Sequence, residues 1–474
     1  MSDAVRGASG SAEGPFVTSG TAVLLERRYR ILVTGYSISS YGTFLNLVAL
    51  NLYVYAVTGR ALAVGAFLAV RFAAGFAAGL VAGPVLARWS AKGVMLWTNL
   101  GQAAALVLLV AAPHGLRPAA LFTVSALVGG AGTLFMVALR SSIPHMVGDG
   151  RHTWANSLMV SGRSMAMVAG FASSGVVVSL LGYSAAFLVD MATFLVCALT
   201  VALLPLTLGP TGRDTGQAAQ DDPADGAADS GADSGAAAGK QRFSAAITAL
   251  AAAPVLGLMV ALRGVDALGS SSHNAALPVY STRLDAHDPA VFVSVFWCVW
   301  ALGNVLVQQA LRQYTRRTER TVGALGFGLG TIAMSATFIL AFAGFPWAAT
   351  VPIALLAGAA DGLTEVSYTS HLQTLPTTLR GHAFGLSATV ENLGFGLGMI
   401  AVAAALDAFS PLSVVGVSHG VAIVLALVFL AQVVRHHGAG AEAVAEAASR
   451  QKEREDDAGP ARGGHRDGAE ISGR

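Results

Sequence analysis

Residues 61–83 read ALAVGAFLAVRFAAGFAAGLVAG, a run of 23 residues in which Arg71 is the single charge. An α-helix needs about 20 consecutive apolar residues to cross the hydrocarbon core of a bilayer. This run therefore predicts a membrane-spanning helix. About twelve such stretches follow one another between Arg30 and Arg435, so the membrane is the solvent of most of this chain.

The composition agrees with a polytopic membrane protein. Hydrophobic residues make up 54% of the 474 residues and charged residues only 12%, a balance that the surface of a soluble protein of this size could not carry. Spans of about 20 residues, instead of alternating strands of about ten, indicate helices that satisfy their own backbone groups in lipid. The predicted fold class is all-α. The expected spans are 31–53, 61–83, 94–112, 119–139, 157–181, 183–207, 246–271, 290–311, 321–344, 348–371, 383–406 and 412–434.

The distribution of basic residues predicts the orientation. Most Lys and Arg near the span ends fall in one set of alternate connections, whereas the other set holds only Arg60, Arg117 and Arg283. Because loops rich in Lys and Arg stay in the cytoplasm, both termini are expected on the cytoplasmic side of the membrane, which requires an even number of spans. The expected location is a bacterial cytoplasmic membrane. The first residues lack the basic start and cleavage site of a signal peptide.

A small, polar and acidic stretch divides the chain into two halves. Residues 209–242 read GPTGRDTGQAAQDDPADGAADSGADSGAAAGKQR, which cannot bury enough apolar surface to order itself. We therefore expect a disordered linker over 209–243 between six-helix bundles at 27–208 and 244–436, with cytoplasmic tails at 1–26 and 437–474. The turn at Ile143-Pro144 resembles the one at Leu375-Pro376, and in that register Arg163 falls opposite Glu391. Two facing half-repeats are the usual build of alternating-access transporters.

Several short motifs occur in an order that resembles the major facilitator superfamily, and within it the drug:proton antiporter branch that includes macrolide exporters. They are Thr58–Ala61, Arg140–Pro144, Ala155–Ser157, Gly162–Ser164, Gly170, Gly182–Phe187, Phe194, Gly358–Gly362 and Pro376–His382. The resemblance covers nearly the whole transmembrane part. It implies twelve helices and proton-driven export of a hydrophobic small molecule.

The loop after the second span departs from the family pattern. Gly83, Arg88 and Lys92 match, with Arg380 in the corresponding loop of the second half, but Ala87 replaces the family's Asp. In the family that Asp takes part in latching the inward-closed state, so the resemblance implies altered gating energetics.

Charged residues within the spans are the sharpest functional signal, since each costs roughly 2.5–3.5 kcal/mol at the bilayer midplane and is rarely kept without a role. Burial favours the protonated form of a carboxylate and a nearby cation favours its ionised form, so an acid whose Arg partner changes between two conformations can carry a proton. The alternative is a permanent ion pair between helices, which Arg263 and Asp266 fit. The proton-coupling candidates are Asp361, Glu365, Glu391, Arg71, Arg163, Asp266 and Arg263. Arg71 is a candidate partner of Glu391, because the resemblance implies that the second and eleventh spans are neighbours at the interface between the halves. Asp190 is interpreted as structural.

The resemblance also implies which helices line the substrate cavity: the first, fourth, seventh and tenth. That nominates aromatic, thioether and amide side chains suited to a bulky, partly apolar ligand, although each could equally be ordinary packing. These candidates are Tyr41, Asn46, Phe135, Met136, Asn274 and Tyr368.

Other chemistries find little support. The three lysines follow no Gly-rich phosphate loop, so transport would be secondary, with the proton gradient as its energy source and no cofactor. Gly416–Gly420 fits a hydrolase Gly-x-Ser-x-Gly pattern but lies within an apolar helix, so no catalytic residue is predicted. Cys197 and Cys298 lack partner spacing, and no metal site is expected.

The sequence thus predicts a secondary exporter of an antibiotic or another secondary metabolite. Its expected partners are membrane lipid and the hydrophobic substrate, with no nucleic acid and a monomeric state. A siderophore or lipid-like metabolite is the alternative cargo. The chain could also be a sensor or assembly protein of transporter shape that moves nothing, although the mid-membrane acids argue against this.

Overall fold

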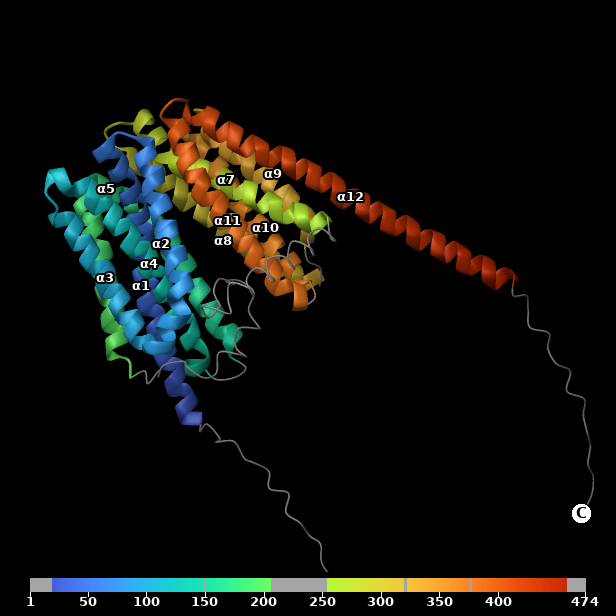
Figure 1. Ribbon diagram of the computed structural model, residues 1–474, viewed down its shortest axis with the longest axis horizontal. Coiled ribbons are helices and arrows are strands. Elements are labelled where there is room, and N and C mark those ends of the chain that lie inside the picture. Colours follow the sequence, from blue (N-terminus) through green and yellow to red (C-terminus); the bar gives the residue numbers. More distant parts are fainter. Residues whose placement is uncertain (1–18, 148–150, 206–253, 319–321, 376, 458–474) are drawn as a thin grey trace, which may run out of the picture.

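The computed structural model describes residues 19–147, 151–205, 254–318, 322–375 and 377–457. Within these ranges the chain forms eleven α-helices and one 3-10 turn (Figure 1). The helices are α1 (Ser19–Thr58), α2 (Ala61–Arg88), α3 (Ala91–Ala111), α4 (Arg117–Val147), α5 (His152–Leu203), α7 (Pro254–Leu284), α8 (Pro289–Thr318), α9 (Gly323–Ala341), α10 (Trp347–Gln373), α11 (Thr377–Leu406) and α12 (Pro411–Asp457), with the turn at His114–Leu116. The all-α prediction is confirmed. The predicted linker 209–243 and the start of the span predicted at 246–271 lie outside the described residues.

Helix α5 contains two of the predicted spans. Its 52 residues would extend about 78 Å as one rod, more than twice the thickness of the bilayer core. The backbone breaks at Gly182, with φ 81° and ψ 173°, a conformation that is open to glycine alone. Both arms pack against the same turns of α1: Gly162 lies against Ser37 in one arm, and Thr200 lies against Gly35 in the other. The two arms therefore form a hairpin around α1.

Ten helical segments of the described residues are long and apolar enough to cross a membrane, and α5 counts once among them. Helix α1 falls outside this set although it is 40 residues long. Its membrane-length part carries Ser, Thr, Tyr and Asn side chains, which lower its mean hydropathy. Several of these side chains are buried inside the bundle, Asn46 and Ser40 among them. Twelve spans with cytoplasmic termini stay a prediction.

The predicted end of the seventh span at 271 was wrong by several turns. Helix α7 continues to Leu284 through the polar run Ser270–Asn274. The backbone of α7 itself satisfies these side chains: Ser271 and Ser272 donate to the carbonyls of Leu268 and Gly269, and Asn274 donates to the carbonyl of Ser270. Hydropathy predicts that a span ends where polar residues begin, but polar side chains do not by themselves end a helix.

Several prolines lie inside helices. Pro144, at the predicted turn after the fourth span, lies inside α4, which ends at Val147. Pro352 likewise lies within the first turns of α10. At the other terminus α12 runs on to Asp457 and projects well beyond the bundle (Figure 1).

The helices divide into two bundles, α1–α5 and α7–α12, coloured blue to green and yellow to red in Figure 1. They meet through α5 against α8 and α2 against α11. The Ala61 N–H donates to Asp407 at 3.0 Å, and the rings of Phe72 and Phe395 are 4.6 Å apart. The first contact lies at the start of α2 and the end of α11, and the second lies nearer the middle of both helices. Toward the opposite ends, an added Cβ would meet nothing within 4 Å at Gly83 of α2 or Gly385 of α11. Figure 1 shows the two bundles together near one end and diverging toward the other.

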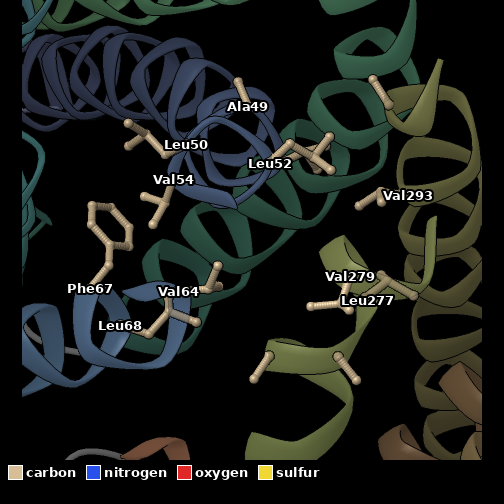
Figure 2. Packing of buried hydrophobic residues seen from close by; sticks show 14 of the residues in the cluster. Ala49, Leu50, Leu52, Val54, Val64, Phe67, Leu68, Leu277, Val279 and Val293 are labelled. Atoms are coloured by element: carbon tan, nitrogen blue, oxygen red, sulfur yellow. The ribbon is translucent and has the colours of Figure 1, made fainter. Parts of the chain in front are cut away.

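The largest cluster of buried apolar side chains includes residues from both bundles. Figure 2 shows part of it, with Leu50 and Val54 of α1 and Phe67 of α2 on one side and Leu277 of α7 and Val293 of α8 on the other. In lipid, helix association depends on close packing and hydrogen bonds, because acyl chains are as apolar as Leu. Close packing of the side chains in this cluster therefore holds the two bundles together.

Candidate functional site

Charged side chains from three helices of the second bundle converge on Arg263 of α7. Its Nη2 lies 2.6 Å from Glu365 Oε2 of α10 and 3.0 Å from Glu391 Oε1 of α11. Its Nε donates to Glu391 Oε2 at 3.3 Å, so this pair is bidentate. Its Nη1 lies 3.6 Å from Asp266 Oδ2, one turn along α7. The side chains of Glu365 and Glu391 are 50% and 43% exposed, whereas those of Arg263 and Asp266 are 12% and 5% exposed.

One guanidinium thus faces three carboxylates. With every group ionised, the cluster carries two uncompensated negative charges within the spans, which is costly in a low-dielectric setting. Asp266 adds a second sign of incomplete pairing, since its Oδ1 is buried without a hydrogen-bond partner. Tyr368 closes the cluster from α10: its ring lies 5.3 Å from the Arg263 guanidinium, and its hydroxyl hydrogen-bonds to Ser387 of α11.

Asp361 and Glu365 lie one turn apart on α10 but have different partners. Asn304 of α8 donates to Asp361 Oδ2 at 3.0 Å and accepts from Gln308 at 2.7 Å. Asp361 therefore faces the α8 contact, while Glu365 joins the Arg263 cluster.

The expected pairing of Arg71 with Glu391 was wrong for this structure, because Arg263 holds Glu391. The expectation that the second and eleventh spans are neighbours is confirmed, since Gly65 packs against Met399 and Ala403. Their contact, however, lies further along α11 than Glu391. The predicted Arg263–Asp266 ion pair is present, within a larger network than the sequence indicated.

In the first bundle, two of the proposed cavity residues lie in the interior. Asn46 is 2% exposed and donates to Asp190 Oδ2 at 2.6 Å, and Asp190 is itself 1% exposed. Phe135 is 6% exposed and stacks on Tyr36 with a centroid distance of 6.0 Å. Both side chains therefore pack helices together in this structure. Asp190, interpreted as structural, accepts a hydrogen bond from Asn46 that ties α5 to α1, and a second from Thr193 within α5.

The remaining cavity candidates are spread over separate places. Asn274 and Met136 are half-buried, and Tyr368 belongs to the Arg263 cluster. Tyr41 accepts a hydrogen bond from Ser173 at 3.0 Å and lines a groove between α1 and α5.

Arg163 of α5 is the residue of the first bundle that the internal repeat matches with Glu391 of the second. Its guanidinium lies 5.3 Å from the Phe44 ring, and its Nη1 is 3.4 Å from the Tyr36 hydroxyl. Both contacts are with α1, as Glu391 of α11 contacts α7. The two positions matched by the internal repeat therefore hold comparable places in their bundles with opposite charge.

The loop residues predicted to take part in gating have structural contacts at helix ends. Lys92 donates to the carbonyls of Ala202 and Leu204 at 2.9 and 2.7 Å, capping the last turn of α5. Arg380 donates to the Leu375 carbonyl. Gly83 and Arg88 are exposed at the end of α2.

The sequence analysis missed a buried pair of histidines in the second bundle. His273 Nδ1 of α7 lies 3.1 Å from His419 Nε2 of α12, and His419 Nδ1 lies 3.1 Å from Ser335 of α9. His273 also stacks on Phe338 with a centroid distance of 3.6 Å. The only signal in the sequence was a histidine inside an otherwise small and polar stretch of a span. The Gly-x-Ser-x-Gly pattern that contains His419 lies within α12, as expected.

Comparison with known proteins decides the family. The model of the Major Facilitator Superfamily matches residues 32–399. The chain belongs to this superfamily. No protein in the curated set matches the sequence.

Solved structures of this transporter fold superpose on most of the chain. The nucleoside transporter NupG aligns with a TM-score of 0.61 at 16% identity, covering 86% of this chain and 98% of the other. A peptide transporter POT in complex with sulfate aligns with a TM-score of 0.63 at 13% identity, covering 86% and 94%. A proton dependent oligopeptide transporter aligns with a TM-score of 0.60 at 14% identity, covering 86% of this chain and 97% of the other. At these identities the likeness establishes the fold.

Proposed function

We propose that this superfamily member is a proton-coupled secondary transporter that exports a hydrophobic small molecule by alternating access. The observation that carries the proposal is the Arg263 cluster, in which one guanidinium faces Asp266, Glu365 and Glu391. Intramembrane carboxylates are costly and rare, and they mark proton relays and the pathways of substrates and ions.

The cluster has the parts that coupling requires. A proton added to Glu365 or Glu391 removes one negative charge and weakens that residue's hold on Arg263, because the neutral acid no longer attracts the guanidinium as an ion. Both side chains are about half exposed, so each keeps a surface at which a proton can arrive. Helices α7, α10 and α11 each contribute one partner, so a change in one ion pair alters how three helices are held together.

The cargo class rests on the motif resemblance to drug:proton antiporters. The aromatic side chains of Tyr36, Phe44 and Tyr368 beside the charged groups favour a ligand with both apolar and polar parts. A siderophore or a lipid-like metabolite is the alternative cargo, and the fold relatives named for nucleosides and peptides extend the list to be screened. A chain of transporter shape that only senses or assists assembly is the alternative from another class.

The setting is proposed as well. Twelve spans place both termini on one side of the membrane, and the basic residues of the connecting loops assign that side to the cytoplasm of a bacterial cell. The ends at which the two bundles diverge then face inward. A single chain holds both bundles, so a monomer is sufficient to form a pathway. Orientation is testable by the accessibility of single cysteines introduced at Arg88 and Arg283, which the charge distribution places on opposite sides.

The direct experiment is proton flux in liposomes. The purified protein is reconstituted with a pH dye inside, and hydrophobic antibiotics, nucleosides and peptides are added in turn under an imposed proton gradient. We expect substrate-dependent flux that is lost in Glu391→Gln and Asp361→Asn. Asp285→Asn is the control, because Asp285 accepts backbone hydrogen bonds in an exposed loop and Asn can make the same turn.

The outcomes separate the alternatives. Flux that persists when Asp361, Glu365 and Glu391 are all neutralised would remove proton coupling from these residues. Absence of flux and of substrate counterflow with every compound, from protein that is monodisperse and thermally stable, would favour the non-transporting role.

A further inference from the structure

A groove of about 600 Å³ runs between α1 and the first arm of α5. Its walls are mostly apolar or small, with Val33 and Ile38 from α1 and Met165, Ala166 and Ala169 from α5. Gly162 lies directly against Ser37, so the two helices touch at the floor of the groove. A groove of this volume is within the range of about 300–1,000 Å³ that holds one ligand or one chain of a ligand.

The groove faces away from the second bundle. Arg163 follows the groove residue Gly162 but points to the other side of the α1–α5 contact, where it meets Phe44. The Phe44 ring lies 5.3 Å from Phe171, and Phe171 lies 5.9 Å from Trp297 of α8. The Arg163 side of α5 is thus the side that faces α8. On the groove side, Ile31 and Ile38 of α1 are 44% and 38% exposed, as expected for a surface that faces lipid.

Basic residues stand at one end of this groove. Arg30 lines it, with its side chain 61% exposed. Glu26 holds Arg30 at 2.5 Å with one carboxylate oxygen and Arg151 of α5 at 2.7 Å with the other. Arg151 and Arg30 hold the pKa of Glu26 below its usual range, so the carboxylate stays ionised and the trio keeps a net positive charge.

The surroundings of Arg30 match the edge of a membrane. Its guanidinium lies 5.6 Å from the ring of Trp154, an aromatic residue of the kind enriched where acyl chains meet headgroups. Arg27 is exposed one turn earlier, near Arg28. A guanidinium has five N–H donors, of which Glu26 occupies one at Arg30, so donors are left for a phosphate.

We propose that this groove binds an anionic phospholipid, with an acyl chain against Val33, Ile38 and Met165 and its phosphate on Arg30 and Arg151. The apolar walls match the chain and the positive mouth matches the headgroup. Such a lipid would join the starts of α1 and α5, which Glu26 already bridges. The inference concerns the lipid-facing side of the first bundle and does not depend on proton coupling.

The test compares two lipids with the same acyl chains on the full-length protein. Delipidated protein in detergent is titrated with phosphatidylglycerol or phosphatidylcholine, and bound lipid is counted by native mass spectrometry. We expect tighter binding of phosphatidylglycerol, and a loss of about fivefold in its affinity in Arg30→Gln, since a basic residue at the surface contributes about that factor. Ala169→Phe, which fills the groove at an exposed position, should also reduce binding. Glycerol phosphate, which has no acyl chains, should fail to displace the lipid.

Matched controls place the same changes elsewhere. Arg312→Gln removes an exposed arginine from α8, and Ala404→Phe adds a ring to an exposed position of α11; both should bind phosphatidylglycerol as the unmodified protein does. Equal binding of the two lipids, equal losses in Arg30→Gln and Arg312→Gln, or full binding in Ala169→Phe would each overturn the proposal. If Ala169→Phe is not monodisperse, Met165→Trp fills the same groove from a side chain that is 74% exposed.

Discussion

Substitution of Gly358 by alanine should separate α10 from α8 and destabilise the second bundle. At Gly358 an added Cβ would overlap the carbonyl oxygen of Trp300 and lie 2.6 Å from its carbonyl carbon. A backbone carbonyl cannot rotate away as a side chain can. The helices would have to move apart by about 1 Å, which forfeits a quarter to a half of the dispersion energy of the atoms along the contact.

The magnitude follows from two opposing effects. Overpacking of a close contact costs about 1–3 kcal/mol, and the upper end applies because the obstacle is backbone. Alanine recovers up to about 1 kcal/mol over glycine within a helix. The net loss is therefore about 2 kcal/mol, or a fall in Tm of about 4–8 °C if the bundle unfolds like a domain of its size. The contact also positions Asn304, which lies one turn after Trp300 and donates to Asp361.

The assay is thermal unfolding of the purified protein in one detergent, with Gly416→Ala as the control. Gly416 lies in α12, and nothing stands within 4 Å of an added Cβ there. We expect the control to keep or raise its Tm. An unchanged Tm in Gly358→Ala, or equal shifts in the two variants, would refute the close approach of α8 and α10.

Three further predictions concern helix ends and the turn within α5. Glu26→Gln should lower Tm at pH 7, and the difference should disappear in acid. Arg151 and Arg30 lower the folded pKa of Glu26 from 4.5. The ion pairs therefore stabilise the fold above pH 4.5, and this stabilisation is lost as the pH falls through the lowered pKa. A difference in Tm that stays constant as the pH falls ever further below 4.5 would contradict the ion pairing. Gly182→Ala should cost about 1–3 kcal/mol of stability in thermal unfolding, because its φ of 81° and ψ of 173° are unfavourable for any other residue, and an unchanged Tm would mean that the two arms do not turn there. Lys92→Gln should cost about 1 kcal/mol by removing a charged donor from the carbonyls that end α5, and faster proteolysis of that helix end than in the unmodified protein would be its signature.

The helices could be predicted from the sequence because hydropathy is a local property. Every apolar run identified between residues 31 and 434 falls on a helix wherever the structure describes it, including the two arms of α5 on either side of Gly182. The exceptions are instructive. The end of α7 was placed too early because Ser271, Ser272 and His273 lower the hydropathy without interrupting the helix, since neighbouring helices and their own backbone satisfy them.

The candidate site was predictable only in part. Charges inside spans are rare enough to stand out, so Arg263, Asp266, Glu365 and Glu391 could all be named in advance. Their grouping could not be, because Arg263 lies 102 residues from Glu365 and 128 from Glu391 along the chain. Which residues face each other depends on how each helix is rotated and how far it has slid along its neighbours. An error of one residue turns a side chain by about 100° around the helix axis.

The sequence by itself determined that this is an integral membrane protein, that its membrane segments are helices, and that a polar stretch separates two sets of them. Hydropathy and polarity are sums over individual residues, and within lipid an apolar run of this length satisfies its backbone hydrogen bonds by forming a helix. Only the tertiary structure decided that Asn46 is buried against Asp190 and that Arg263 holds Glu391 in place of Arg71. Contacts between helices depend on small differences in packing among many similar apolar surfaces, and those differences exist only once the helices are assembled.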